Sequence, residues 1–385
     1  MTANSCGRSD ADDRSGVVDV VGTRASISRP KRPLRERSTV TDPSPDADPS
    51  LGKIDRTVFE RQIAPRLGAD RDDVVLGPTH GVDFGVLDVG GRAVVVATDP
   101  VSILPDLGLE RAARFALDIV LTDVAVSGIS PSHLSISFTL PPEMTDEQFA
   151  TIWEAIHEEC VDLGIAITAG HTARYAGISY SWVGGATVLG VGDHEAVVRP
   201  DGARPGDVLL LTTGPAVEAV ALLSTLFGDQ IDVSESTLED AGACLDDSFA
   251  VRDALTAAVS APVHAMHDVT EGGLAGALVE MSEGSGTRFE IDRSAVPIRP
   301  AVREVCDALE MDPWRATSCG SLVIAVDPGD VSATVEALES RGTTVAEIGH
   351  VEGPGDAPEV RVDGAVLEHP GVDSSWSAFE RFAEF

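Results

Sequence analysis

Residues 77–100 read GPTHGVDFGVLDVGGRAVVVATDP and hold two hydrophobic runs joined by Gly90 and Gly91. A Gly-Gly pair between such runs is typical of a tight β-hairpin, because its turn residues need positive φ. Asp83 lies just before the first predicted strand, and Asp99 lies at the end of the second. The segment around Gly81 and Asp83 is rich in backbone groups that could approach phosphates closely. We therefore expect this hairpin to belong to a ligand-binding α/β domain.

Four carboxylates lie at or beside hydrophobic stretches in different parts of the chain, where strands or helices are predicted. They are Asp83, Asp99, Asp123 in LTDVAV and Asp268 in HDVTEGG. Buried like charges repel and raise one another's pKa unless a cation accompanies them. Mg²⁺ is commonly held by one or two carboxylates together with substrate phosphates. The set predicts a divalent metal holding a polyphosphate, although Asp99 alone could cap a turn and Asp123 alone could lie on an exposed helix face.

A histidine motif follows a predicted strand at residues 168–175, TAGHTARY. We expect a turn there that offers Gly170, His171, Thr172 and Arg174. His171 could act as a metal ligand, a general base or a phosphate hydrogen-bond donor. The alternative is an ordinary surface histidine.

Residues 267–281, HDVTEGGLAGALVEM, place Asp268, Thr270, Gly272 and Gly273 directly before an apolar helix. Such a helix N-terminus can receive an anion, since its first backbone N–H groups have no partner within the helix. Thr270 could equally cap the helix itself. Both interpretations remain open from the sequence.

Composition limits the class of protein. The chain has 385 residues and a formal net charge of −35, which disfavours binding to nucleic acids and anionic membranes at low salt. Such acidity is typical of proteins from a very salty cytosol, where screening shortens repulsion. There is no apolar run of 18 residues and no secretory signal, so we expect a cytoplasmic protein. The five cysteines match neither a disulfide framework nor a metal motif.

Pattern along the chain indicates three parts. Residues 1–50 predict a disordered tail, 51–193 an N-terminal α/β domain that binds ATP and metal, and 194–385 a C-terminal α/β domain. The fold class is α/β (α+β) with two domains. Helices are expected at 54–67, 109–127, 145–164, 271–284 and 329–341, with a capping box from Thr145 to Gln148.

An ordered series of motifs in this chain resembles the aminoimidazole ribonucleotide synthetase (PurM-like) superfamily. The motifs are GPTHGVDFGVLDVGG, VVVATDPV, LTDVAVSGISPSHL, GIAITAGHTARY, HDVTEGGLAGALVEM and SCGSLVIAV. The similarity is greatest to its archaeal HypE-like branch of AIR synthase-related proteins. It implies a homodimer formed through the N-terminal domain, with ATP and Mg²⁺ as cofactors. It also implies that Asp83, Asp99 and Asp123 hold metal and phosphates, while Asp268 and Thr270 line the substrate side.

The resemblance implies phosphorylation of a small molecule or of a partner's side chain. Two departures keep alternatives open. The family turn GDT is GHT here, so His171 replaces a carboxylate, and the chain ends AEF instead of the terminal Cys that HypE modifies. A thiamine-monophosphate-kinase-like activity and a non-catalytic nucleotide-binding scaffold are the two alternatives.

Overall fold

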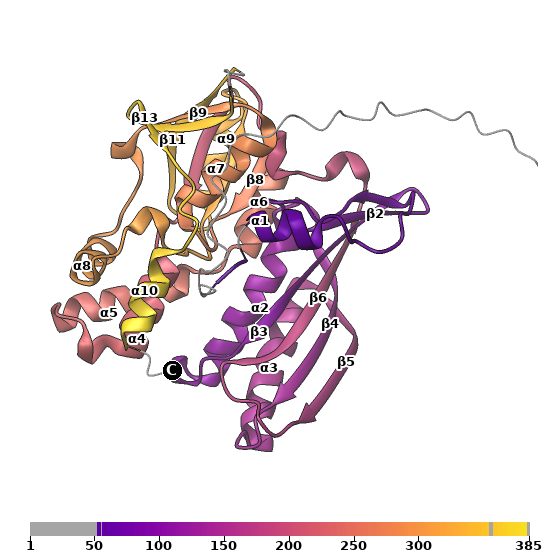
Figure 1. Cartoon of the computed structure of the whole chain (residues 1–385), viewed down its shortest axis with the longest axis vertical. Coiled ribbons are helices and arrows are strands. Elements are labelled where there is room, and N and C mark those ends of the chain that lie inside the picture. The colour runs from indigo at the N-terminus through magenta and orange to yellow at the C-terminus, as the bar shows by residue number, and fades with distance from the viewer. Residues whose placement is uncertain (1–51, 55, 354–356, 383–385) are drawn as a thin grey trace, which may run out of the picture. The chain divides into compact units, whose positions relative to one another are not determined.

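The computed structural model describes residues 52–54, 56–353 and 357–382. Within these residues the chain forms two β-sheets, each packed against α-helices (Figure 1). The predicted α/β fold with two domains is therefore confirmed. The tail predicted for 1–50 lies outside the described residues. None of the helices in the described part is long and apolar enough to cross a membrane.

The first sheet has six strands in the order β1-β2-β3-β6-β4-β5. Neighbours pair antiparallel except β4 and β5, which are parallel and connected through a helix. Gly90 and Gly91 form the predicted hairpin turn with φ of +64° and +86°. The strands span β1 Val74–Leu76, β2 Gly85–Val89, β3 Arg92–Ser102, β4 Pro131–Leu140, β5 Ala166–Arg174 and β6 Trp182–Gly192.

Side chains of β3 alternate between the two faces of this sheet. Ala93, Val95 and Ala97 are buried, and helix α2 (Leu109–Ala125) contacts β3 and β6. Because side chains two apart on a strand share a face, Asp99 lies in this buried register. The hydrophobic alternation of β3 thus aims one carboxylate at α2.

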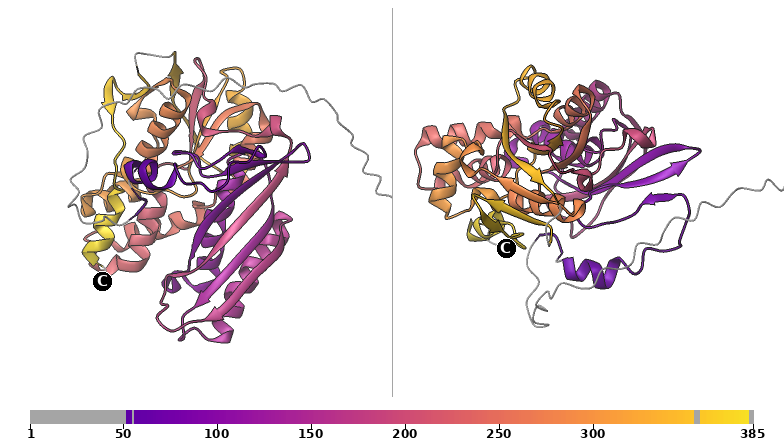
Figure 2. Two further views of the ribbon diagram at one scale, coloured as in Figure 1. Left: turned by 45° about the vertical axis from the view of Figure 1, so that its right-hand side comes forward. Right: turned by 90° about the horizontal axis from the view of Figure 1, so that it is seen from above.

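Helix α3 (Asp146–Leu163) packs against α2 and β5, and Figure 2 shows α2 and α3 along one face of the sheet. The predicted capping box is present. Thr145 Oγ1 accepts from the Gln148 N–H, and the Gln148 side chain accepts from the Thr145 N–H. This reciprocal pairing satisfies two backbone donors at the start of α3.

The second sheet has seven strands in the order β13-β12-β9-β11-β7-β10-β8. Leu210 and Ile324 face one hydrophobic cluster, whereas Leu209 and Val323 face the other. Because β7 and β10 are buried on both faces, their sequences are apolar without interruption. The strands span β7 Val208–Thr212, β8 Val263–Asp268, β9 Arg288–Ile291, β10 Leu322–Val326, β11 Val345–Glu352, β12 Glu359–Val362 and β13 Ala365–Leu367.

Helices cover both faces of this sheet. Helix α7 contacts β8, β9, β10 and β12, whereas α6 contacts β8 and α9 contacts β11. The helices span α4 Val217–Phe227, α5 Glu235–Ala243, α6 Val251–Ser260, α7 Gly273–Ser285, α8 Pro300–Leu309, α9 Val331–Glu339 and α10 Ser374–Phe382. The domain division predicted at residue 193 falls between the two sheets.

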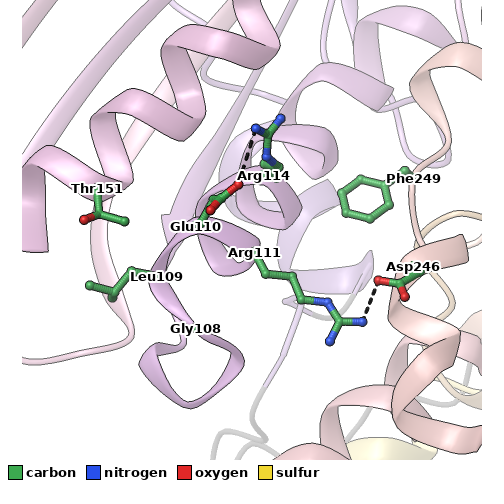
Figure 3. Close-up of a pocket in the computed structure, with 8 residues that line it drawn as sticks. All are labelled: Gly108, Leu109, Glu110, Arg111, Arg114, Thr151, Asp246 and Phe249. Atoms are coloured by element: carbon green, nitrogen blue, oxygen red, sulfur yellow. Dashed lines mark hydrogen bonds and ion pairs between the residues drawn. The ribbon is translucent and has the colours of Figure 1, made fainter.

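A hollow of about 640 Å³ opens between the start of α2 and residues of the second domain (Figure 3). Arg111 lines it and pairs with Asp246, with 2.7 Å between Nη2 and Oδ1. Phe249 and Thr151 also line it. The hollow contains none of the residues predicted for the site, so we do not assign the chemistry to it.

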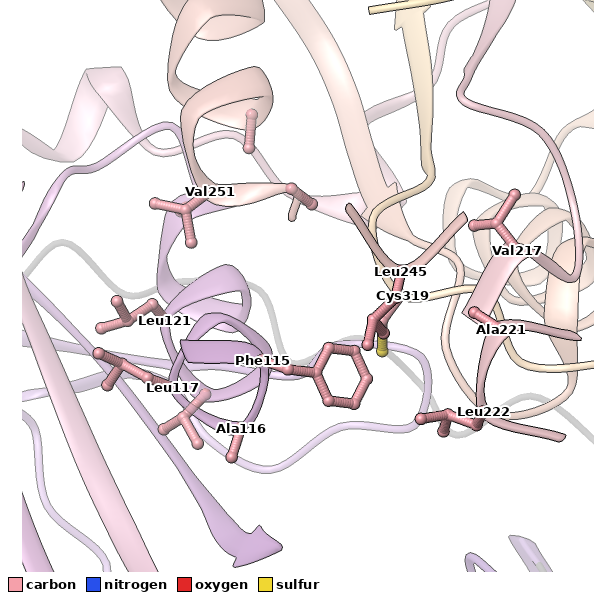
Figure 4. Packing of buried hydrophobic residues seen from close by; sticks show 14 of the residues in the cluster. Phe115, Ala116, Leu117, Leu121, Val217, Ala221, Leu222, Leu245, Val251 and Cys319 are labelled. Carbon is pink, nitrogen blue, oxygen red and sulfur yellow. The ribbon is translucent and has the colours of Figure 1, made fainter. Parts of the chain in front are cut away.

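Hydrophobic packing joins the two domains. Phe115 of α2 belongs to the same buried cluster as Leu245 and Val251 of the second domain (Figure 4). Nearby, the Ala250 N–H donates to the buried carboxylate of Asp118 on α2 at 2.8 Å. These contacts fix α2, and with it Asp123, against the second sheet's domain.

Two local predictions differ from the structure. The helix predicted for 54–67 is reduced to α1 (Arg56–Val58) and a π-helical turn (Phe59–Ile63). The turn predicted for 168–175 was wrong, because β5 continues through Arg174. A side-chain Cβ at Gly170 would lie 2.6 Å from the Ile136 carbonyl oxygen. The glycine therefore permits close strand packing and does not mark a turn.

Candidate active site

Asp99 and Asp123 form a carboxyl pair between β3 and α2, with Asp99 half-buried and Asp123 buried. Asp99 comes from the buried register of β3, and Asp123 lies on α2 with 6% of its surface exposed. Their side chains hydrogen-bond to each other. A hydrogen bond between two carboxyls requires a proton on one of them. The structure thus brings together two of the three residues predicted to bind metal.

Burial governs the protonation of this pair. It raises the pKa of Asp99 to about 6, although the hydrogen bond to Asp123 partly opposes the shift. Burial, with the negative charge of Asp99, raises the pKa of Asp123 well above its ordinary value. Burial therefore opposes full ionisation of the pair, a nearby cation would favour it, and the oxygen-only donors suit Mg²⁺.

Asp83 and Asp268 complete the carboxylate cluster from the other side. Asp83 precedes β2, and Asp268 ends β8, the edge strand of the second sheet. His267 lies between them, with its Nδ1 3.2 Å from Asp268 Oδ1 and 3.5 Å from Asp83 Oδ2. Burial raises the pKa of Asp83. Burial opposes ionisation of Asp268, but the hydrogen bond and the positive charge of His267, together with the charge of Lys53, outweigh it and lower the pKa of Asp268.

Two basic residues that were not among the predicted site residues, Lys53 and His267, lie beside these carboxylates. Lys53 Nζ lies 3.7 Å from Asp83 Oδ1, and its side chain is 61% exposed. Asp83 raises the pKa of Lys53. Burial alone would lower the pKa of His267, but Asp268 and Glu280 raise it well above the usual value. The rarity of Lys, present only at 31 and 53, was the one signal for Lys53.

Glu280 of α7 forms a second layer behind His267. Its Oε2 lies 2.9 Å from His267 Nε2, and its Oε1 lies 3.6 Å from His369 Nε2 and 3.8 Å from His80 Nδ1. Burial opposes ionisation of Glu280, but the hydrogen bond and the positive charge of His267, together with the nearby Lys53, lower the pKa of Glu280 well below the usual value. Gly81 has φ of +74°, and a Cβ there would lie 3.0 Å from Glu280 Cβ. Gly81 thus lets the segment that carries Asp83 rest on α7.

The glycine turn before α7 binds an anion from the chain itself. The Gly272 N–H donates to Asp373 Oδ2 at 2.8 Å, and no side chain caps α7, whose N-cap is Gly272. Thr270 contributes its carbonyl oxygen, which accepts from the Gly273 N–H at 2.8 Å. Capping by the Thr270 side chain was therefore the wrong alternative.

Glu271 ties distant parts of the chain to this turn. Its Oε1 accepts from the Lys53 backbone N–H at 2.8 Å and from Trp376 Nε1 at 3.1 Å. Segments at opposite ends of the described chain therefore meet beside Asp268.

Models of two domains of one family match this arrangement of two sheets. "AIR synthase related protein, N-terminal domain" matches residues 81–191, and "AIR synthase related protein, C-terminal domain" matches residues 204–361. Together they cover most of the chain. The chain belongs to the AIR synthase-related family. This PurM-like, HypE-like membership confirms the resemblance inferred from the motifs.

Relatives in the family have similar lengths. The chain is 27% identical over 279 residues to the carbamoyl dehydratase HypE of Rhizobium leguminosarum bv. viciae, covering 70% of this chain and 77% of that protein. It is 29% identical over 334 residues to the selenide, water dikinase of Nitratidesulfovibrio vulgaris, covering 77% and 91%. Both relatives carry the names of enzymes, a dehydratase and a dikinase.

Solved structures of AIR synthase-related proteins share the fold. The E. coli hydrogenase maturation protein HypE matches with a TM-score of 0.62 and 27% identity, over 73% of this chain and 87% of that one. A HypE structure in complex with ATP matches with a TM-score of 0.61 and 21% identity, over 85% and 98%. The latter similarity bears on the fold alone.

The remaining predicted site residues of this AIR synthase-related chain lie on β5, away from the carboxylates. Asp99, Ala186, Ile136 and Gly170 are register partners across four adjacent strands. At strand spacings near 4.8 Å, Gly170 is about 14 Å from Asp99 within one chain. The chain therefore does not bring the predicted β5 residues to the cluster by itself.

Local contacts account for several of these β5 residues. The exposed His171 Nε2 lies 3.1 Å from the Tyr175 hydroxyl, and Arg174 donates to the Met144 carbonyl and to Asp146 at the start of α3. Thr172 is exposed on the same strand. Nucleotide or catalytic roles for Gly170, His171, Thr172 and Arg174 stay predictions.

Proposed function

We propose that this chain is an ATP- and Mg²⁺-dependent phosphoryl-transfer enzyme of HypE-like type. Its acceptor would be a small molecule or a side chain of a partner protein. One observation carries the proposal, namely the convergence of Asp83, Asp99, Asp123 and Asp268 from both sheets. The resemblance to ATP-dependent PurM-like enzymes and the dikinase relative support the choice of ATP.

Charge and donor type fit a metal-bound triphosphate. The carboxyls of Asp99 and Asp123 lie against each other, and Asp83 Oδ2 is buried without a hydrogen-bond partner among the described residues. Carboxylates in this state favour a hard divalent ion. Asp83, Asp99 and Asp123 would hold Mg²⁺, which neutralises phosphate charge as the phosphoryl group moves.

The chain's own contribution is to position the reactants and to keep them dry. Phosphoryl transfer needs alignment and charge stabilisation more than a covalent catalyst. Asp123 and Asp268 are buried, so a ligand bound between them would be shielded from water. Asp268 and Thr270 would face the acceptor, and Lys53 would neutralise charge from the solvent side.

A homodimer would account for the exposed β5. Tyr175, directly after the edge strand β5, is 46% exposed, and Trp182, at the start of β6 two strands further in, is 58% exposed. A second copy packed there would cover both rings and could bring β5 residues to the nucleotide. Sedimentation equilibrium in molar KCl tests this part of the proposal, and a monomer at micromolar concentration would contradict it.

The test of the enzymatic proposal is ADP release in molar KCl with ATP, Mg²⁺ and a panel of candidate acceptors. We expect acceptor-dependent ADP release that Asp123→Asn abolishes, whereas Asp106→Asn at an exposed position leaves it unchanged. Thermal stabilisation by ATP without ADP release from any acceptor would instead favour a nucleotide-binding scaffold. Unchanged turnover in Asp123→Asn would overturn the metal assignment.

A further inference from the structure

The link between β13 and α10, residues 368–373, packs against the start of α7. A Cβ added at Gly272 would lie 3.4 Å from Pro370 Cγ and 3.8 Å from His369 Nε2. The family's C-terminal domain model matches residues 204–361, so this link lies outside the matched part of the chain. The contact with α7 therefore comes from a segment that the shared domain does not include.

Asp373, the last residue of this link, places a carboxylate at the N-terminus of α7. The residue is 2% exposed, and its Oδ2 accepts from the Gly272 N–H at 2.8 Å. Its Oδ1 accepts from the Ser375 N–H and hydroxyl at 2.8 and 2.6 Å. The first N–H groups of a helix have no partner within it and attract negative charge. Asp373 thus occupies the place that an anionic ligand would take.

A second carboxylate adds negative charge to the same turn. Glu271 lies between Asp268 and the first residue of α7, and its Oε1 accepts from the Lys53 N–H and from Trp376 Nε1. Burial raises the pKa of Asp373, and the charge of Glu271 adds to this shift. Like charges repel strongly where the surroundings are buried and weakly screened. A phosphate or carboxylate at this turn would therefore be repelled unless Asp373 moved away.

We infer that Asp373 determines the charge of the acceptor, by excluding acceptors that present a phosphate or a carboxylate to the turn before α7. The inference rests on the proposed function, which places Asp268 and Thr270 beside the acceptor. A phosphate would need the Gly272 N–H, which already donates to Asp373. An uncharged or cationic group needs no such donor and is not repelled. The acceptor is therefore an uncharged or cationic molecule or side chain, which excludes phosphate monoesters such as thiamine monophosphate.

Inorganic phosphate, titrated into the full chain in molar KCl with EDTA and followed by the ³¹P line width, tests this inference without turnover. Asp373→Ala frees the Gly272 N–H and removes a charge, so phosphate should bind about tenfold more tightly than to the wild type. Asp373→Asn keeps an acceptor oxygen and should show a smaller gain. Asp292→Ala is the matched control. Asp292 accepts from the Ser294 N–H and hydroxyl at 2.8 and 2.6 Å, as Asp373 does from Ser375, but it caps a 3₁₀ turn instead of α7.

Equal phosphate affinity in the wild type and in Asp373→Ala would overturn the inference, and so would an equal gain in Asp292→Ala. If Asp373→Ala fails to fold, the titration of Asp373→Asn decides, and no gain there would overturn it. ADP release by the wild type is measured with acceptors in pairs, with and without a phosphate monoester. Preference for the phosphorylated member would overturn the inference and keep the proposed enzyme. ADP release from no acceptor would remove the enzyme, and the phosphate titration would still decide whether Asp373 excludes anions.

Discussion

The two halves of the carboxylate cluster differ in chemistry although they lie side by side. Asp99 and Asp123 come from one sheet and its helix, and their side chains offer only oxygen donors. Asp83, His267 and Asp268 come from both domains and include a nitrogen. Burial opposes ionisation of the first half, whereas His267 lies against the carboxylates of the second half. Adjacent parts of one carboxylate cluster thus offer different donor atoms.

The largest effect should come from the oxygen-only pair. Asp99→Asn removes a ligand charge, so Mg²⁺-dependent ADP release should fall on the order of a hundredfold to a thousandfold. His267→Asn should reduce Mg²⁺-supported turnover by only about tenfold. Steady-state rates with Mg²⁺ and with Mn²⁺ check both variants. Equal losses with both metals would remove the distinction between the two halves.

The Asp99–Asp123 pair should also make the free energy of unfolding depend on pH. A carboxyl whose pKa is raised by folding stabilises the folded state below about pH 4, and this contribution is lost as pH rises through the folded pKa. For Asp99, whose pKa is about 6, the free energy of unfolding should fall by up to about 3 kcal/mol between pH 4 and 7. Urea unfolding with EDTA measures it, and Mg²⁺ should restore stability mainly above pH 6.

Asp118 provides the control for this experiment. Burial raises its pKa to about 7, yet it accepts from the Ala250 N–H at the domain boundary and is not a predicted metal ligand. Part of the pH dependence of the free energy of unfolding should come from Asp118 and should be the same with and without Mg²⁺. Asp118→Asn should remove that part. If Mg²⁺ left the remaining pH dependence unchanged, the pair would not bind it.

A smaller effect is expected at the glycine turn before α7, beside Asp268. Asp373→Asn keeps an acceptor for the Gly272 N–H but loses the negative charge. We expect a loss of about 1 kcal/mol in the free energy of unfolding and a change in the acceptor's KM without a change in Mg²⁺ affinity. Chemical denaturation and steady-state kinetics measure these quantities. An altered Mg²⁺ affinity would show that the turn and the pair are not independent.

The smallest effect is expected at β5. His171→Asp should change Mn²⁺ affinity by less than about twofold in a monomer, because an exposed charge about 14 Å away is well screened. Isothermal titration under conditions of known oligomeric state tests it. A large rise in affinity confined to a dimer would indicate that the neighbouring copy places residue 171 at the cluster.

Hydrophobic pattern predicted the scaffold and most of the carboxylates. The alternation of β3 and the apolar run around Asp123 identified residues that meet in the structure. The sequence also predicted a local hydrogen-bond motif correctly, namely the capping box at Thr145. These features depend on neighbours close in sequence.

Long-range contacts could not be read in this way. Glu280 reaches His267 only because α7 packs back on β8, and Asp373 reaches Gly272 across 101 residues. Gly170 suggested a turn, but its small size serves the close approach of Ile136 on the neighbouring strand. Composition does not distinguish these two uses of glycine.

Glu271 accepts hydrogen bonds from both Lys53 and Trp376, and this has a consequence for folding during synthesis. The carboxylates that we propose to bind metal in the first domain leave the ribosome long before Trp376 does, by on the order of ten seconds or more at ordinary translation speeds. Until then one wall of the centre is missing. A nascent chain stalled before α10 should therefore fold its first sheet and still fail to retain nucleotide.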